Sequence, residues 1–369
     1  MKIGVLTSSR ADYGIYLALL EKMKDDERFQ VEIIAFGMHL QIRQGNTINE
    51  VINDGYNIIH KVGDMPERDT IIDISKGYGE MIIEFAHFWH ENKFDLVFAL
   101  GDRWEMSAAV QAAIPFELQI AHIHGGETTL GATDNIYRHQ ISLASNYHFT
   151  AAEEFSKRVT SILGSNKNVH TVGSISLENI DKLQLPSWDS VKERFDIPFD
   201  EFILVTFHPE SVGASMNKHY AGVISNVLKS LSNEHNILVT KANSDAMGSL
   251  LNDCFQLLQE EHPGKIKLVS ALGKLNYFKA MQQCTFMLGN TSSGIIEAAS
   301  FAKYVVNVGD RQKGRLRNEN IIDVPFDIVE ILMAIKSVAE RNHYRGLNKY
   351  VRMGTSDTII KIITLDERL

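Results

Sequence analysis

The stretch that decides the fold runs from Val97 to His139 and reads VFALGDRWEMSAAVQAAIPFELQIAHIHGGETTLGATDNIYRH. It contains two apolar strands that end in polar residues, GDR at Gly101–Arg103 and HIHGGE at His122–Glu127, followed by DNIYRH from Asp134. Ligands of open α/β sheets bind where the strands end. These polar clusters therefore predict one site assembled from neighbouring loops.

The alternation of strands and helices extends along the chain in both directions. In the first half we expect a helix over Tyr13–Lys24 and strands at Ile3–Thr7, Val31–Phe36, Asp95–Leu100 and Leu118–Ile123. In the second half we expect strands at Phe202–Thr206, Ile237–Lys241, Ile266–Val269, Phe286–Gly289 and Tyr304–Val308. Short apolar strands separated by helices indicate a parallel sheet covered on both faces. The predicted fold class is α/β, with two Rossmann-like domains facing across a cleft.

The 369 residues exceed one typical core, so two domains are expected. Residues 1–180 are predicted to form the first domain and residues 181–350 the second. The stretch Lys182–Asp200 contains two prolines and interrupts the apolar pattern, which makes it the predicted linker. Residues 351–369 are expected to end in a helix over Thr355–Leu369, and docking on the first domain is one arrangement for it.

Composition limits the classes of partner. The formal net charge of -9 argues against a general affinity for nucleic acid or for an anionic membrane, but a local basic patch can still bind a small anion. The two cysteines, Cys254 and Cys284, form no CxxC pair, which indicates neither a disulfide framework nor a structural zinc. No apolar run reaches membrane-spanning length and MKIGVLTSSR lacks a signal-peptide core, so a cytoplasmic protein is expected.

The segment LGNTSSGIIEAASFAKYVVNVGDRQKGR, Leu288–Arg315, carries the main ligand signal of the second half. A hydroxyl-rich turn precedes a helix expected over Ile295–Phe301, where free backbone N–H groups can seat a phosphate. The candidate ligand contacts are Thr291, Ser292, Ser293, the ribose-binding candidate Glu297 and, for a diphosphate, the cations Arg311, Lys313 and Arg315. The alternatives are an ordinary helix cap and a solvated basic loop.

Other candidates follow other predicted strands. His208 of FHPE, His39 of GMH and Arg10 of SSRAD can reach a phosphate or sugar, although each can equally serve a structural role. Asn243 and Asp245 lie at an equivalent strand end, where plain turn residues are the alternative. No GxGxxG is present, which argues against a nicotinamide or flavin cofactor.

The opening stretch supplies groups for proton transfer. The candidate acids and bases are Asp102, His124, Glu127 and Asp134, and the charged or polar neighbours are Arg103, Arg138, His122 and His139. A metal site is the rival interpretation. His122 and His124 alternate along a strand and should point to opposite faces, so we rank metal binding below acid–base chemistry.

With these motifs assembled, the chain resembles the UDP-N-acetylglucosamine 2-epimerase family, and more closely its hydrolysing branch. The resemblance spans nearly the whole chain, from SSRAD and GMH through GDR, HIHGGE, DNIYRH and HP to GNTSSG and GDRQKGR. It implies a glycosyltransferase-B-like fold, a UDP-sugar substrate held mainly by the second domain, and a homodimer or homotetramer. Neither a metal nor a redox cofactor is required by the family's chemistry.

The resemblance also implies roles for residues. The uridine diphosphate contacts it implies are His208, Thr291, Ser292, Glu297 and Arg311, with Asn243 nearby and Arg10 reaching across. Asp102 and Asp134 match the family's catalytic carboxylates. The family removes the C2 proton and expels UDP from C1 to give a glycal; water then adds at C1 and a proton returns to C2 on the opposite face.

One residue departs from the family's pattern. His124 stands where the hydrolysing branch commonly has Glu, and the spacing to the DN pair is one residue longer. Three explanations are open: His124 takes over proton transfer, Glu127 replaces the missing Glu, or the substrate is another sugar, such as the UDP-N,N'-diacetylbacillosamine of legionaminic rather than sialic acid synthesis. A non-hydrolysing epimerase, a glycosyltransferase and a catalytically silent nucleotide-sugar sensor are the alternative functions.

Overall fold

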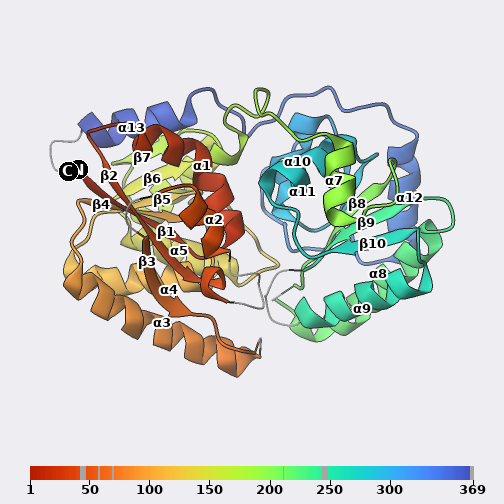
Figure 1. Ribbon diagram of the computed structural model, residues 1–369, viewed down its shortest axis with the longest axis horizontal. Coiled ribbons are helices and arrows are strands. Elements are labelled where there is room, and N and C mark those ends of the chain that lie inside the picture. Colours follow the sequence, from red (N-terminus) through yellow and green to blue (C-terminus); the bar gives the residue numbers. More distant parts are fainter. Residues whose placement is uncertain (42–46, 57–58, 69, 211, 243–247, 366–369) are drawn as a thin grey trace. The chain divides into compact units, whose positions relative to one another are not determined.

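The computed structural model describes the chain except residues 42–46, 57–58, 69, 211, 243–247 and 366–369 (Figure 1). The chain divides into two compact units. Unit 1 comprises Met1–Glu127, Asp134–Asn179 and Tyr350–Leu369, and unit 2 comprises Thr128–Thr133 and Ile180–Lys349. The boundary falls near residue 180, but six residues of the first half, Thr128–Thr133, belong to unit 2.

Unit 1 is built on a parallel sheet with the strand order β3-β2-β1-β4-β5-β6-β7 in its described part. Its strands are β1 (Lys2–Thr7), β2 (Gln30–Gly37), β3 (Ile59–Asp64), β4 (Leu96–Leu100), β5 (Ile120–Ile123), β6 (Tyr147–Thr150) and β7 (Val169–Thr171). The order reverses between β1 and β4, and such a switch point is where ligands bind in doubly wound sheets.

Helices cover both faces of this sheet (Figure 1). They are α1 (Arg10–Lys24), α2 (Ile48–Asn53), α3 (Ile71–Glu91), α4 (Trp104–Ala113), α5 (Asp134–Ala144), α6 (Glu153–Leu163) and α13 (Thr355–Leu365). Ile3 and Val5 of β1 are buried in one core cluster with residues of α1 and α13, whereas Leu6 joins a second cluster with residues of α3 and α4. The alternation of side chains along a strand thus supplies two cores.

Unit 2 repeats the plan with the strand order β10-β9-β8-β11-β12-β13. Its strands are β8 (Ile203–Thr206), β9 (Ile237–Thr240), β10 (Ile266–Val269), β11 (Met287–Gly289), β12 (Val305–Val308) and β13 (Ile321–Val324). Its helices are α7 (Trp188–Phe195), α8 (Asn217–Leu231), α9 (Gly248–Glu261), α10 (Lys274–Gln283), α11 (Ser292–Ile296) and α12 (Ile328–Ala339). Short 3-10 helices occur at Met38–Leu40, Ile114–Phe116, Ile175–Leu177, Ala214–Met216 and Ala298–Phe301. All strand pairs are parallel, so the predicted α/β class is confirmed.

Two predictions about local structure were wrong. The predicted linker Lys182–Asp200 contains α7, which Ser187 caps and whose Trp188 and Val191 are buried in the core of unit 2. Polar residues on the exposed face of this short helix hid its apolar side. The helix expected over Ile295–Phe301 begins three residues earlier as α11, because the Thr291 hydroxyl accepts a hydrogen bond from the Ser293 N–H and caps it there.

The C-terminal helix α13 is part of unit 1. Ile359 and Ile363 are fully buried in the core cluster of α1. At its start the Ser356 N–H donates to Glu178 Oε2 at 2.8 Å, and the Thr355 hydroxyl donates to the Val172 carbonyl at 2.8 Å. Hydrogen bonds and apolar burial together fix this helix on unit 1.

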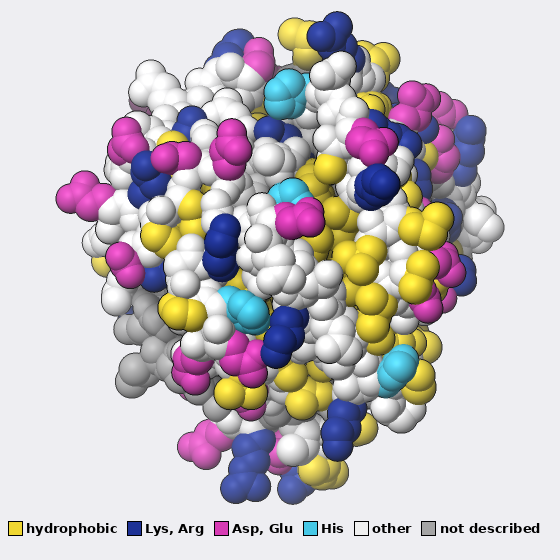
Figure 2. Space-filling view, turned by 90° about the vertical axis from the view of Figure 1, so that its right-hand side faces the viewer, with side chains coloured by type: hydrophobic (Ala, Val, Ile, Leu, Met, Phe, Trp, Pro, Cys, Tyr) yellow, Lys and Arg dark blue, Asp and Glu magenta, His cyan; other side chains and the backbone are white. Residues whose placement is uncertain are grey.

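Charged side chains of both signs are intermixed on the face shown in Figure 2, with apolar side chains exposed between them. This face therefore carries no broad field of one sign. Among the described residues, no helix is both long enough and apolar enough to cross a membrane.

Candidate active site

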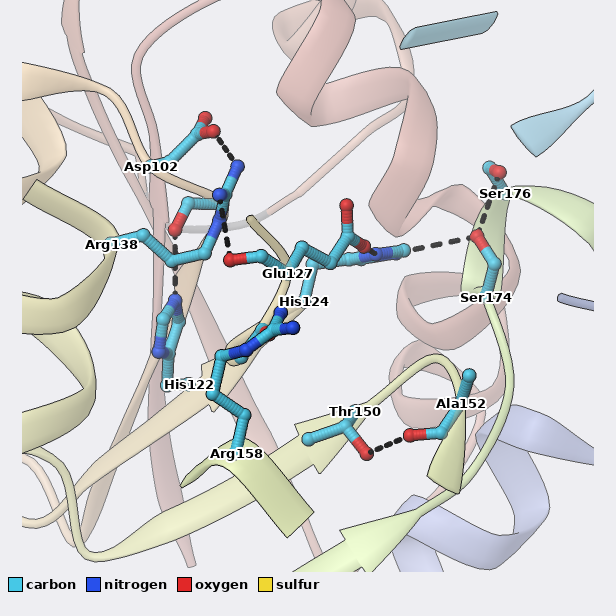
Figure 3. A network of polar contacts seen from close by, with 12 residues as sticks. Asp102, His122, His124, Glu127, Arg138, Thr150, Ala152, Arg158, Ser174 and Ser176 are labelled. Carbon is cyan, nitrogen blue, oxygen red and sulfur yellow. Dashed lines mark hydrogen bonds and ion pairs between the residues drawn. The ribbon is translucent and has the colours of Figure 1, made fainter. Parts of the chain in front are cut away.

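The GDR and HIHGGE motifs follow adjacent parallel strands. Ala99 of β4 pairs with His122 of β5, and Leu100 pairs with Ile123, so the loops after both strands leave the same edge of the sheet. The edge lies beside the switch point between β1 and β4. The structure therefore brings Asp102 and the His124–Glu127 turn into one neighbourhood (Figure 3).

Arg138 connects these two loops. Its guanidinium forms an ion pair with the Asp102 carboxylate through Nη2, and Nη1 donates to the Glu127 carbonyl at 3.0 Å (Figure 3). The Arg138 side chain is almost wholly buried, whereas the Asp102 side chain keeps 21% of its surface exposed. A permanently charged guanidinium favours the ionised form of a neighbouring carboxylate. Arg138, a predicted ligand contact, is here turned inward and orients Asp102.

His124 and Glu127 form a buried pair. His124 Nδ1 lies 2.8 Å from Glu127 Oε1, and Nε2 lies 3.3 Å from the Ser174 hydroxyl, which in turn contacts Ser176 at 3.0 Å. With Glu127 ionised, Nδ1 is the donor to the carboxylate and Nε2 is the acceptor from Ser174. An imidazole bonded in this way can take up or release a proton through either nitrogen.

The turn that carries this pair depends on backbone conformations that few residues adopt. His124 has a φ of 64° and Gly126 a φ of 77°, both in the left-handed region. A Cβ on Gly126 would lie 2.3 Å from the Phe155 carbonyl oxygen. Arg158 donates to the Gly126 carbonyl at 2.6 Å and fixes the turn from the side of α6. The backbone therefore holds His124 over Glu127.

His122 has different partners from His124, but not because the two alternate along one strand: β5 ends at Ile123, and His124 follows it with a φ of 64°. Its Nε2 lies 2.8 Å from the Gly101 carbonyl and its Nδ1 lies 3.0 Å from the Ser142 hydroxyl. Burial lowers the pKa of His122 to about 3, so its ring is neutral at ordinary pH. It serves to hold the loop after β4.

The remaining candidates of unit 1 differ in their surroundings. Asp134 begins α5. Burial raises the pKa of Tyr137 in the same turn, with further contributions from Tyr78, Asp134 and Glu105. His139, one position after Arg138, is partly buried, and burial lowers its pKa, with a contribution from Arg138 and Arg158. Asp134 therefore lies near Tyr137, and His139 lies near Arg138 and Arg158.

Three predicted ligand contacts of unit 1 are occupied by protein groups. Arg10 forms an ion pair with Glu50 at 2.9 Å, and Arg103 Nε donates to the buried Glu105 at 2.5 Å. His39 is buried with its nitrogens 2.9 Å from the hydroxyls of Thr7 and Thr47, and burial lowers its pKa to about 4. In this structure His39 is a bridging residue between β1 and the segment before α2.

In unit 2, the loops after β8, β11 and β12 are tied together by buried polar side chains. Asn290 accepts from the His208 N–H at 2.8 Å and donates to the His208 carbonyl at 2.9 Å. Gln312 Nε2 donates to the Asn290 carbonyl at 2.8 Å. Glu210 Oε1 accepts the N–H groups of Asp310 and Arg311 at 2.7 and 3.0 Å. His208 and Arg311 are thus held in one framework.

The hydroxyl-rich turn lies at the same strand ends. Gly289 closes β11 so tightly that a Cβ would meet the Thr206 carbonyl oxygen at 1.9 Å, which only glycine permits. Ser292 and Ser293 begin α11 and are partly buried, and Glu297 directly after the helix is buried. The predicted contacts of unit 2 therefore cluster, except Asn243 and Asp245, which lie outside the described residues.

Sequence reasoning missed the residues that support the site. Ser174 and Ser176 come from a small polar run, GSIS, after β7, and Glu210 stands in the FHPE motif without having been assigned a role. Asn290 was predicted only as a residue of the hydroxyl-rich turn. Only Asn290 directly follows an apolar strand, β11, which was an available signal; Ser174 and Glu210 lie further along the loops after β7 and β8. Among the described residues, no group of three or more His, Cys, Asp or Glu side chains is arranged to hold a metal ion.

Two helix-covered parallel sheets with polar strand ends define a two-domain α/β protein of the glycosyltransferase-B-like class. The crystal structure of Methanocaldococcus jannaschii UDP-GlcNAc 2-epimerase in complex with UDP-GlcNAc and UDP has the same fold, with a TM-score of 0.81 at 16% identity over 99% of this chain and 100% of that one. The sequence model of the UDP-N-acetylglucosamine 2-epimerase family matches residues 21–364, and the chain belongs to this family.

Two relatives are similar in sequence over most of their length. UDP-N,N'-diacetylbacillosamine 2-epimerase (hydrolyzing) of Legionella pneumophila is 32% identical over 367 residues, 98% of this chain and 95% of that protein. Polysialic acid biosynthesis protein P7 of Escherichia coli is 30% identical over 334 residues, 90% of this chain and 85% of that protein. These similarities and the family match confirm the resemblance read from the motifs.

Proposed function

We propose that this protein is a hydrolysing 2-epimerase that converts a UDP-linked 2-acetamido sugar to UDP and the free sugar inverted at C2. The substrate is UDP-N-acetylglucosamine or UDP-N,N'-diacetylbacillosamine. The hydrolysing assignment is supported by the name of the Legionella pneumophila relative, and the sugar class by that name and by the description of the family. The observation that carries the proposal is the presence of two candidate proton-transfer groups at one sheet edge, the partly exposed Asp102 with Arg138 and the buried pair of His124 and Glu127.

The first step is an elimination. A base removes the C2 proton, the electrons of the C2–H bond form the C1–C2 double bond, and the C1–O bond breaks as UDP leaves with its electron pair. We assign Asp102 as the base, because its carboxylate is held by Arg138 at the end of β4 and part of its side chain is exposed.

The second step adds water to the glycal. The water oxygen bonds to C1 as a hydroxyl while a proton is delivered to C2 on the face opposite to the first abstraction; the proton that water gives up restores the donor, and Asp102 releases its proton to solvent. We assign the His124–Glu127 pair as the proton donor, because the Glu127 carboxylate orients the imidazole through its Nδ1 and a histidine ring can carry the proton. Asp134, at the start of α5, completes the set of acids.

The uridine diphosphate is assigned to unit 2. Arg311 and His208 would meet the diphosphate, Thr291, Ser292 and Ser293 would offer hydroxyl and backbone donors, and Glu297 would bind the ribose. Cations on a leaving diphosphate stabilise the charge that develops as the C1–O bond breaks. Arg10, His39, Arg103, His139, Asn243 and Asp245 stay predicted ligand contacts of second rank.

The test is product analysis. Purified protein is incubated with each of the two UDP-sugars, and proton and phosphorus NMR follow the nucleotide and the sugar. We expect free UDP and a free sugar of inverted C2 configuration in equal amounts with one of the two substrates. An inverted sugar still attached to UDP would instead identify a non-hydrolysing epimerase, and binding of UDP-sugar with no turnover would identify a silent sensor.

A further inference from the structure

We propose that Thr128–Thr133 is a positioning segment that links the diphosphate-binding loop of unit 2 to the proton-transfer residues, with Gly131 as its key residue. The inference rests on the proposed function, and it concerns residues to which neither the motifs nor the family resemblance assigns a role. It predicts that this segment controls turnover more than nucleotide affinity.

The path of the chain is the first observation. The chain leaves unit 1 directly after Glu127, contributes Thr128–Thr133 to unit 2, and returns to unit 1 at Asp134. Both flanking residues belong to the proposed proton-transfer set. No spare residue separates them from the segment, so a displacement of the segment is carried directly to Glu127 and Asp134.

Hydrogen bonds hold the segment within unit 2. The Leu130 N–H donates to the Lys313 carbonyl at 2.9 Å, and the Gly131 carbonyl accepts the Val212 N–H at 3.3 Å. Within the segment, the Ala132 N–H donates to the Thr129 carbonyl at 3.1 Å and forms a turn. The turn is therefore bonded to the loop after β8 and to the loop after β12.

Gly131 lies against the peptide that carries Arg311. A Cβ at Gly131 would lie 2.5 Å from the carbonyl carbon and oxygen of Asp310 and 2.6 Å from the Arg311 nitrogen. The same peptide is held by Glu210, which accepts the N–H groups of both residues. The Asp310–Arg311 peptide is thus fixed by the Glu210 carboxylate and by the backbone of Gly131.

A second close approach lies in the same loop. A Cβ at Gly314 would meet Thr128 Cγ2 at 2.8 Å. The segment and the GDRQKGR loop therefore pack closely at two positions, once at the Asp310–Arg311 backbone and once through the Thr128 side chain. Movement of the loop that carries Arg311 is therefore passed to the segment that joins Glu127 to Asp134 along the chain.

Gly131→Ala tests this inference, with Gly222→Ala as the matched control because a Cβ at Gly222 of α8 meets nothing within 4 Å. For both variants, kcat and KM are measured by UDP release, and UDP affinity by calorimetry. Since Glu210 still holds both N–H groups, we expect Gly131→Ala to bind UDP within about threefold of the control while kcat falls at least about tenfold.

A Gly131→Ala variant whose kcat stays within about twofold of Gly222→Ala overturns the inference, and so does a loss confined to UDP affinity. If Gly131→Ala shows no cooperative thermal unfolding, Leu130→Pro replaces it, because proline removes the N–H donor to the Lys313 carbonyl at a residue whose own side chain is exposed. The same split between kcat and affinity is expected. If the wild-type protein releases no UDP from either sugar, both the proposed function and this inference are overturned. If the wild type is active, the variants test this inference separately from the proposed function.

Discussion

His124 occupies a backbone conformation that residues with a Cβ adopt at a cost. Its φ of 64° falls in the left-handed region, which disfavours a non-glycine residue by about 1 kcal/mol. The cost is offset by the contacts to Glu127 and Ser174. A residue held in a strained conformation within a buried polar network is often a functional one, which favours the first of the three explanations for the departure at this position.

Substitutions of His124 distinguish a role in proton transfer from a purely structural role. His124→Asn retains a residue that tolerates positive φ and can still bond to Glu127, but it cannot carry a proton. We expect His124→Asn and His124→Ala to fold like the wild type and to lose activity by about 10²- to 10⁴-fold in kcat. UDP-release kinetics and thermal unfolding provide the two readouts.

His124→Glu tests the alternative explanation. The new carboxylate would stand beside Glu127, which lies 2.8 Å from the present imidazole, and two buried like charges repel each other. We therefore expect His124→Glu not to restore the activity lost in His124→Ala. Wild-type activity in His124→Asn, or a fully active His124→Glu, would contradict a proton-transfer role for the imidazole.

At the scale of elements, the loops after β8, β11 and β12 act as one unit because Glu210, Asn290 and Gln312 bond them together. Each of these side chains is buried, and Glu210 has its pKa raised by burial. A buried acceptor that holds two backbone N–H groups leaves both unsatisfied when it is removed. Glu210 therefore determines the conformation of the loop that carries Arg311.

Glu210→Ala should weaken nucleotide binding. We expect the dissociation constant of UDP to rise about tenfold, because releasing the loop loses roughly one well-formed hydrogen bond to the diphosphate. Glu210→Gln keeps an oxygen acceptor at the same place and should stay close to the wild type. Calorimetric titration with UDP measures both variants, and equal affinities for Ala and Gln would rule out this positioning role.

Some contacts between these elements could be predicted from the sequence, and others could not. The GDR and HIHGGE loops were expected to meet because consecutive parallel strands with a short helix between them are usually neighbours, and β4 and β5 are adjacent. The Arg138 side chain is buried only once α5 has packed in the folded protein, and the Ser174 hydroxyl contacts His124 although the two residues are 50 positions apart in the sequence. Such contacts arise from the folded core and leave no local pattern.

At the scale of the whole molecule, strand periodicity predicted two parallel-sheet halves, but not the path of Thr128–Thr133 or α7. The six residues Thr128–Thr133, of which only Leu130 is large and apolar, carry no periodic signal that would assign them to the other unit. The C-terminal helix was recognisable as a helix, whereas its place on α1 depends on Ile359 and Ile363 meeting a core formed by residues far away in sequence.

Three buried histidines of unit 1 should make the protein sensitive to acid. Burial lowers the pKa of His122 to about 3 and the pKa of His39 and His148 to about 4, from an ordinary value of 6.5. As the pH falls, these histidines therefore take up protons in the unfolded chain before they do so in the folded chain. The contribution of the neutral histidines to the free energy of unfolding is fully present above about pH 6.5 and is lost progressively as the pH falls toward 4.

Denaturant unfolding at pH 7.5 and pH 5 measures this effect. We expect the free energy of unfolding to be lower at pH 5 by about 2 kcal/mol for each of the three histidines, as an upper estimate. His148→Gln should reduce the difference between the two pH values, while His87→Asn, at an exposed position of α3, serves as the matched control. An unfolding free energy that is unchanged between the two pH values would refute the neutral state of these rings.

The central claim is that the C2 proton is removed and returned on the opposite face while UDP is lost. The most direct measurement is the reaction of UDP-N-acetylglucosamine and UDP-N,N'-diacetylbacillosamine in deuterated water, followed by NMR, with Asp102→Asn in parallel. We predict free UDP together with a C2-inverted free sugar carrying one deuterium at C2, and loss of both products in Asp102→Asn. UDP release with the original hydrogen retained at C2, or no UDP release from either sugar, would contradict the account.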